Sequence, residues 1–245
     1  MALTSPARVV SVSGINPTLP LASRLRELLP SVTARGESLP LIDGIDLPRG
    51  AVVELAAPMG LGRATQLALT ACANAQRISR AIAHDGEPRW CGFVDPTATL
   101  HAPAVAEAGV ALERLIVVRP EPESIAKVAV RMATSRVFAV LVVDRCGVPG
   151  AELDAPRTRW DIAVRRLALA CESTDTTVIV RSELERARSD SLPVAMRIEL
   201  TRPEAQLAKL TVVKDRRGTA GGVRLLELAA GRPTSTRLRE VVGAR

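Results

Sequence analysis

Apolar runs of strand length, separated by helical segments, most constrain what this chain can fold into. The clearest is Phe138–Asp144 (FAVLVVD), in which every residue before the aspartate is apolar. A strand that is apolar on both sides must be buried on both faces of its sheet, which is typical of parallel sheets covered by helices. Such runs are far shorter than the roughly 18 apolar residues that suggest a membrane span. The sequence therefore predicts an α/β fold with a mostly parallel central sheet flanked by helices.

The other elements follow from periodicity and from turn residues. Strands are predicted at residues 51–57, 90–95, 115–119, 138–144 and 176–181, and helices at 66–80, 102–107, 124–135 and 157–171. After Pro193 three strands follow without intervening helices, at 194–200, 207–214 and 222–228. These last strands predict a C-terminal antiparallel extension of the sheet.

The length of 245 residues allows one large α/β domain with short extensions. We predict a core at residues 38–230, an N-terminal extension at 1–37 and a basic tail at 231–245. Residues 21–29 of the extension have the apolar spacing of a short amphipathic helix, which would pack on its own domain or on a partner. Residues 38–50 are a turn-rich lead-in to the first core strand.

The net charge of +7 is unevenly distributed. Residues 1–130 carry 12 basic and 12 acidic side chains, whereas residues 131–245 carry 21 basic and 14 acidic ones. This asymmetry favours an acidic partner, either nucleic acid or an acidic protein surface. The N-terminus lacks a basic stretch followed by an apolar one, so we expect a cytoplasmic, nucleoid-associated protein without a secretory signal.

The four cysteines lie far apart, without a C-x-x-C pair, and the chain has two histidines. This composition predicts buried thiols and no metal site.

A glycine-bearing turn at residues 57–65 (APMGLGRAT) stands between a predicted strand and a predicted helix. This is the context of a phosphate-binding P-loop, G-x-x-x-x-G-K-[S/T], in which backbone N–H groups cradle phosphates, Lys neutralises them and a hydroxyl binds Mg²⁺. Here Arg63 replaces the lysine and Ala64 the hydroxyl residue. The candidate loop residues are Ala57, Pro58, Gly60, Gly62, Arg63, Ala64 and Thr65, of which Gly62 alone keeps its place in the motif.

These substitutions remove the chemical groups of a nucleotide-hydrolysing site. We therefore predict no catalytic residues, no ATPase activity, no metal and no cofactor. Two interpretations stay open for the loop: weak residual nucleotide binding, with Arg63 contacting a phosphate, or a turn kept for its strand-to-helix geometry alone.

The order of elements from about residue 38 to 228 resembles the core of the RecA family. Residues 141–144 (LVVD) resemble a Walker B strand with Asp144 in place. Asp144 would then hold Mg²⁺ through water, or else be a strand-end carboxylate bound to nearby N–H groups or to Arg145. Residues 93–96 (FVDP) resemble the strand that delivers the family's catalytic glutamate, which aligns with Thr97.

Two further segments carry this resemblance. Residues 178–182 (VIVRS) resemble the strand whose γ-phosphate-sensing glutamine aligns with Ser182. Residues 212–216 (VVKDR) resemble a V-V-K-x-K segment whose basic residues reach the neighbouring subunit's nucleotide, and they align with Lys214 and Arg216. The resemblance makes these two residues a candidate RecA-type subunit interface; the alternative is a solvated basic turn.

Residues 146–159 and 182–193 correspond to the DNA-binding loops of RecA. Arg181, Arg186 and Arg188 are candidate DNA backbone contacts. Because neither segment has an aromatic residue at its tip, base stacking would be poor, and we expect weak, non-specific, salt-dependent DNA binding at most. The alternative is an ordinary solvated surface.

Within the RecA family, this set of departures resembles ImuA proteins. That resemblance implies a catalytically inactive adaptor in damage-induced translesion synthesis and mutagenesis. The implied partners are an ImuB-type inactive homologue of Y-family polymerases and RecA, whose filaments the chain would modulate; self-association stays open. Two alternatives are a divergent RecA-type DNA-dependent ATPase or recombinase and a SulA-type cell-division inhibitor.

Overall fold

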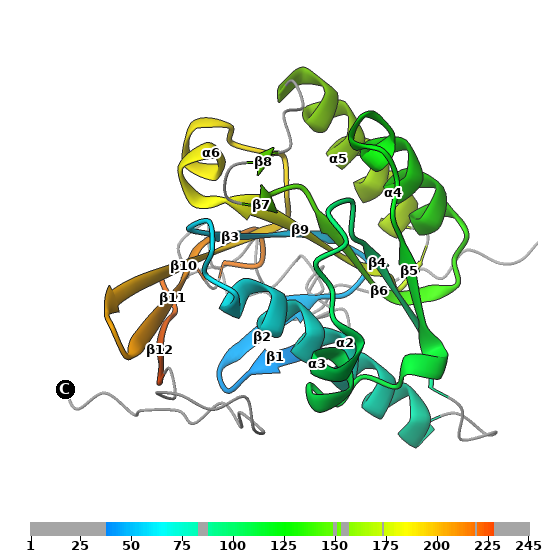
Figure 1. The fold of residues 1–245 in the computed structure, drawn as a ribbon, viewed down its shortest axis with the longest axis horizontal. Helices are drawn as coiled ribbons and strands as arrows, with labels where there is room; N and C mark the ends of the chain where they lie inside the picture. Colours follow the sequence, from blue (N-terminus) through cyan, green and yellow to red (C-terminus); the bar gives the residue numbers. More distant parts are fainter. Residues whose placement is uncertain are drawn as a thin grey trace, which may run out of the picture. The chain divides into compact units, whose positions relative to one another are not determined.

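The structure is a computed structural model that describes residues 38–82, 88–148, 151–152, 157–172, 174–218 and 220–227, with the side chains of 151, 152, 157 and 158 excepted. Its described residues form an α/β fold around a mixed sheet of eight strands flanked by helices (Figure 1). This confirms the α/β fold that the apolar runs predict. The predicted helix at 21–29 and the basic tail at 231–245 lie outside the described residues.

The eight-stranded sheet has the order β12-β11-β10-β3-β9-β6-β4-β5. Neighbouring strands from β10 to β5 are parallel, whereas β11 is antiparallel to β10 and to β12, which confirms the predicted C-terminal extension. The strands are β3 (Val52–Ala57), β4 (Trp90–Val94), β5 (Leu115–Val118), β6 (Phe138–Asp144), β9 (Thr177–Glu183), β10 (Met196–Glu204), β11 (Leu207–Asp215) and β12 (Val223–Glu227).

Helices cover both faces of this sheet, because its central strands are apolar on both sides. On one face α2 packs on β3, β4 and β6, and on the other α4 packs beside α5 (Figure 1). The helices are α2 (Arg63–Ile82), α3 (Ala102–Glu107), α4 (Ile125–Thr134), α5 (Arg157–Glu172) and α6 (Leu184–Ser189), with the short 3₁₀ turns η1 (Leu112–Arg114) and η2 (Pro122–Ser124). In the described part of the chain, no helix combines the length and the apolar character that crossing a membrane requires.

The predicted lead-in at residues 38–50 is an antiparallel hairpin of β1 (Ser38–Ile42) and β2 (Ile45–Pro48). Asp43 and Gly44 form its two-residue turn, with a φ of +74° at the glycine. An Asp-Gly pair between alternating apolar residues is a strong local signal for such a hairpin. The prediction for this segment gave only a turn-rich lead-in, because other turn-forming residues surround the pair. The hairpin covers α2 with its buried side chains, Leu39, Leu41, Ile45 and Leu47.

A buried charge joins the three strands at the centre of the sheet. The side chain of Glu54, on β3, has no solvent exposure. Its carboxylate accepts a hydrogen bond from Ser182 Oγ on β9 at 2.7 Å and one from Arg197 Nε on β10 at 2.7 Å. Both bonds are needed, because an unpaired charge in this position would cost several kcal/mol. The strand was predicted from its apolar residues, and the sequence pattern gives no sign of the partners of Glu54, which lie on distant strands.

Breaking this buried pair from one side should destabilise the fold. We expect Glu54→Gln to lower the free energy of unfolding by about 3–5 kcal/mol, because it leaves the Arg197 guanidinium buried without a counter-charge. The double variant Glu54→Met/Arg197→Met should recover most of that loss. Urea unfolding measures both effects. The matched control is Arg188→Met, which removes a more exposed pair with Glu199 and should cost at most about 1 kcal/mol. Equal losses in Glu54→Gln and in the control would contradict the prediction.

Candidate functional site

A hollow of about 160 Å³ lies at the carboxyl ends of β3, β6 and β9, beside the start of α2. In open α/β sheets this edge is where ligands bind. The hollow gathers most of the loop and both Asp144 and Arg181, but Arg63 is not among the residues that line it. The lining residues are Ala57, Pro58, Met59, Gly60, Leu61, Gly62, Ala64, Thr65, Thr99, Asp144, Cys146, Gly147, Val148 and Arg181.

The backbone of the loop closes on itself. Leu61 donates its N–H to the carbonyl of Pro58 at 3.2 Å, and the turn between them is permitted by a φ of +79° at Gly60. Ala64 donates its N–H to the carbonyl of Leu61 at 3.3 Å. A P-loop binds phosphate with its free backbone N–H groups, so two of the donors that the motif would use have partners inside the loop.

The side chain in the lysine position is also engaged. Arg63, the first residue of α2, donates a hydrogen bond from Nη1 to Oε1 of Gln66 on the same helix. Ala64, in the position of the metal-binding hydroxyl, is buried and carries only a methyl group. The loop therefore offers the hollow neither the cation nor the hydroxyl of the motif.

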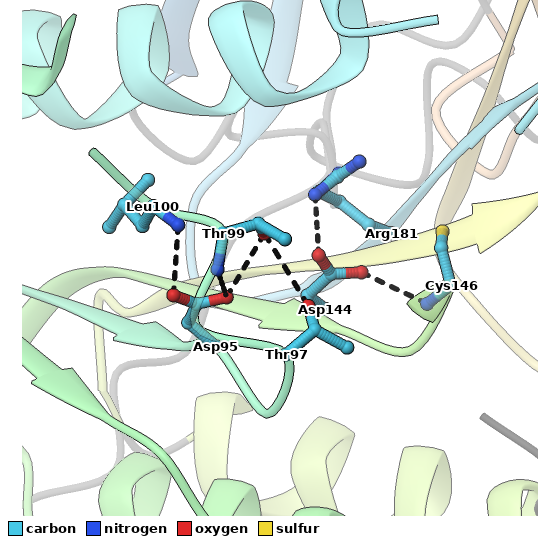
Figure 2. A network of polar contacts seen from close by, with 7 residues as sticks. All are labelled: Asp95, Thr97, Thr99, Leu100, Asp144, Cys146 and Arg181. Carbon is cyan, nitrogen blue, oxygen red and sulfur yellow. Dashed lines mark hydrogen bonds and ion pairs between the residues drawn. The ribbon is translucent and has the colours of Figure 1, made fainter. Parts of the chain in front are cut away.

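The carboxylate in the Walker B position forms an ion pair within the wall of the hollow (Figure 2). Asp144 Oδ2 lies 2.6 Å from Arg181 Nη1, and Asp144 Oδ1 accepts the backbone N–H of Cys146 at 2.9 Å. The strand register explains the pair, since Asp144 of β6 and Arg181 of β9 are direct neighbours. Of the two interpretations of Asp144, the geometry matches the strand-end carboxylate, with Arg181 as its partner.

Of the two partners considered for that carboxylate, a nearby N–H group is found, that of Cys146, whereas Arg145 pairs elsewhere. The Arg145 guanidinium is buried and lies 4.9 Å from the ring centre of Trp160, and its Nη2 is 3.7 Å from Asp190 Oδ2. Burial lowers the pKa of Arg145. Asp144 is the last residue of β6, and Arg145 follows it directly. Because successive side chains of an extended chain point to opposite faces, Arg145 does not face Asp144.

The strand that resembles the one carrying the RecA family's catalytic glutamate is followed by a closed turn (Figure 2). Asp95, fully buried at the end of β4, accepts hydrogen bonds from the backbone N–H of Thr99 at 3.1 Å and of Leu100 at 3.0 Å. The Thr99 hydroxyl also contacts it, at 3.2 Å. Thr97 Oγ1 lies 3.4 Å from Thr99 Oγ1. Asp95 therefore fixes the loop that brings Thr99 to the hollow, while Thr97 is not among the lining residues.

The candidate DNA contacts lie in different surroundings. Arg181 is only 13% exposed, because it faces Asp144. The second predicted loop begins instead with α6, whose N-terminus is capped by Glu183 accepting two backbone N–H bonds. Arg186 and Arg188 lie on this helix, and Arg188 is paired with Glu199 at 2.9 Å. Short polar helices give little periodicity, which is why α6 was not predicted.

The first predicted DNA loop, residues 146–159, is described in part. It contains β7 (Gly147–Val148) and β8 (Ala151–Glu152), an antiparallel pair.

The candidate subunit-interface residues lie around the end of β11, away from the residues that line the hollow. Lys214 donates from Nζ to the carbonyl of Leu192 at 3.4 Å, and partial burial, together with Arg216, lowers its pKa. Arg216 is exposed in the turn that follows.

A scan of the chain against protein-family models finds no match, and a search of curated proteins finds no relative. The described fold and hollow define the class of this chain as an α/β protein with a strand–loop–helix pocket, in whose wall Asp144 and Arg181 form an ion pair. Among the described residues, no group of three His, Cys, Asp or Glu side chains is placed to hold a metal ion.

The thiol of Cys146 reports on the polarity of this pocket. Burial, and after it the negative charge of Asp144, raises the pKa of Cys146 to about 12. We therefore expect its alkylation by iodoacetamide at pH 8 to be at least 100-fold slower than that of glutathione, because the reactive thiolate is scarce. Peptide mass spectrometry measures the rate at this site. In Asp144→Asn the rate should rise, since a charge that disfavours the thiolate is removed. A wild-type rate equal to that of glutathione would contradict the described pocket.

Proposed function

We propose that this chain is a RecA-like adaptor without ATP turnover, which acts by protein contacts in damage-induced translesion synthesis. The observation that carries the proposal is the ion pair between Asp144 and Arg181, the two charged side chains that line the pocket. A pocket whose charges neutralise one another has little to offer a triphosphate and its metal ion.

The chemistry of phosphoryl transfer explains why this pairing matters. The reaction depends on groups that neutralise the phosphates and hold Mg²⁺, and loss of one such group commonly costs orders of magnitude in rate. In this loop the lysine and hydroxyl positions hold Arg63 and Ala64, and the strand-end carboxylate of Asp144 is 2.6 Å from a guanidinium. These losses favour a protein that acts by binding its partners, and not an enzyme that hydrolyses ATP.

The RecA-like part of the proposal rests on the resemblance of the sequence and on agreement of the fold with it. The loop strand β3 is central, Ser182 lies near the carboxyl end of its neighbour β9, and Asp144 lies at the carboxyl end of β6, the next strand beyond β9. The partners we propose are RecA and an inactive homologue of Y-family polymerases. Lys214 and Arg216 are the residues we propose for the RecA contact.

The absence of turnover can be tested directly. With purified protein, calorimetry should give a dissociation constant for MgATP weaker than about 1 mM, a binding free energy of less than about 4 kcal/mol. Phosphate release should not exceed that of buffer, with or without single-stranded DNA. The control is Arg63→Ala, which should behave identically. Hydrolysis that disappears in Asp144→Asn would instead establish the alternative, a divergent DNA-dependent ATPase.

The RecA contact has a separate test. Reversing both charges, Lys214→Glu/Arg216→Glu, should weaken capture of RecA by immobilised protein at least tenfold, because like charges would then replace complementary ones. The matched control is Arg80→Glu, an exposed residue in the last turn of α2, which should leave capture unchanged. Far-UV circular dichroism checks that the variants fold. If wild type captures no RecA but does capture the tubulin-like division protein, the SulA-type alternative replaces this proposal.

A further inference from the structure

The outward face of α5 carries two large apolar side chains that the fold leaves in solvent. Ile162 is 55% exposed and Leu169 is 67% exposed. Seven residues separate them, so they lie two turns apart on one side of the helix, roughly 10 Å from each other along its axis.

Packing of α5 against its own sheet does not account for this pair. At 100° per residue, Ile162 and Leu169 point away from the side of the helix that meets the core. The core-facing side is already complete, with the buried residues Trp160, Ala163, Val164, Leu167 and Cys171. An isolated exposed aliphatic residue is ordinary, but two aligned on the face opposite the core form a stripe that a partner can cover.

Cations flank this stripe. Arg159, Arg165 and Arg166 are exposed, and within the described residues none of their side chains makes a hydrogen bond or an ion pair. On the helical projection Arg165 lies on one side of the apolar pair, and Arg159 and Arg166 lie on the other. The exposed acidic residue of α5 is Glu172, at its last position.

The neighbouring helix adds further positive charge beside this stripe. α4 packs beside α5 on one face of the sheet (Figure 1). It exposes Lys127 and Arg131, which are four residues apart on one side and are likewise without ion pairs in the described chain. Unpaired charges of one sign around an apolar centre attract a surface of the opposite sign and a matching apolar core.

We infer that the α4–α5 face is a docking surface for an acidic amphipathic helix of another protein. The two-turn spacing of Ile162 and Leu169 matches the seven-residue repeat of apolar residues on a facing helix, and the flanking cations match acidic residues beside that repeat. The inference stands on this face alone and does not depend on the nucleotide loop or on the proposed function.

Together, the apolar pair and the charges favour an acidic helix over nucleic acid and over a second copy of this chain. Nucleic acid is bound through its phosphates, for which Ile162 and Leu169 offer nothing. A second copy of this chain would bring a like-charged face against the first, which is unfavourable. An acidic helix uses both features of the surface.

The test uses a fluorescent synthetic helical peptide with leucine at every seventh position, flanked by glutamate, and the full-length chain. Anisotropy should show saturable binding that weakens at least tenfold in Ile162→Ser/Leu169→Ser and at least tenfold in Arg159→Glu/Arg166→Glu. Because all four residues are exposed, the variants should fold normally, which circular dichroism checks. The control is Ile82→Ser, which removes an even more exposed isoleucine, at the end of α2, and should leave binding unchanged.

Other outcomes overturn the inference. They are absence of peptide binding, binding that survives loss of the apolar pair, and equal binding of a peptide with serine in place of leucine. Tighter binding to single-stranded DNA that is indifferent to Ile162→Ser/Leu169→Ser would make the face a nucleic-acid surface. Binding to vesicles of anionic phospholipid that needs the apolar pair, without peptide binding, would make it a membrane surface. Dimerisation that is lost in the same variant would make it a self-association surface.

Discussion

A carboxylate lies in the middle of the central strand without solvent contact, and the strands on either side hold it. Glu54 is bonded to Ser182 and to Arg197, so β9, β3 and β10 cannot shift relative to one another without leaving a buried charge unpaired. Such a shift would also break the parallel ladders on both sides of β3. These bonds therefore fix the carboxyl ends of the three strands at one edge of the sheet. The positions of these ends set the shape of the hollow beside the loop.

The alternation of side chains along β9 connects this network to the hollow. Ser182 faces the side of the sheet that holds Glu54, and Arg181, one residue earlier, faces the opposite side. The register with β6 then places Arg181 directly beside Asp144. One strand thus binds a buried acid on each of its faces, through a hydroxyl on one side and a guanidinium on the other. The pairing of Asp144 with Arg181 is in this sense a consequence of sheet geometry, and it needs no dedicated loop to maintain it.

Sequence reasoning succeeded where local patterns decide structure and failed where distant residues meet. The apolar run at residues 138–144 was enough to predict a buried parallel strand with the same bounds as β6. The helix α6 was missed because its few apolar positions show no clear period. The pairs Asp144–Arg181 and Glu54–Arg197 join residues 37 and 143 positions apart, and only the strand order brings them together. Residue types alone could not choose Arg181 over Arg145.

The closed backbone of the loop has a consequence for how this chain could change over evolutionary time. Replacing Arg63 by lysine and Ala64 by threonine would take two codon changes and would provide a compact ammonium group and a hydroxyl. It would not release the N–H groups of Leu61 and Ala64 from the carbonyls of Pro58 and Leu61, because side chains do not set those bonds. The main chain would have to open as well, so two side-chain changes alone would leave part of the loop's backbone unable to receive a phosphate.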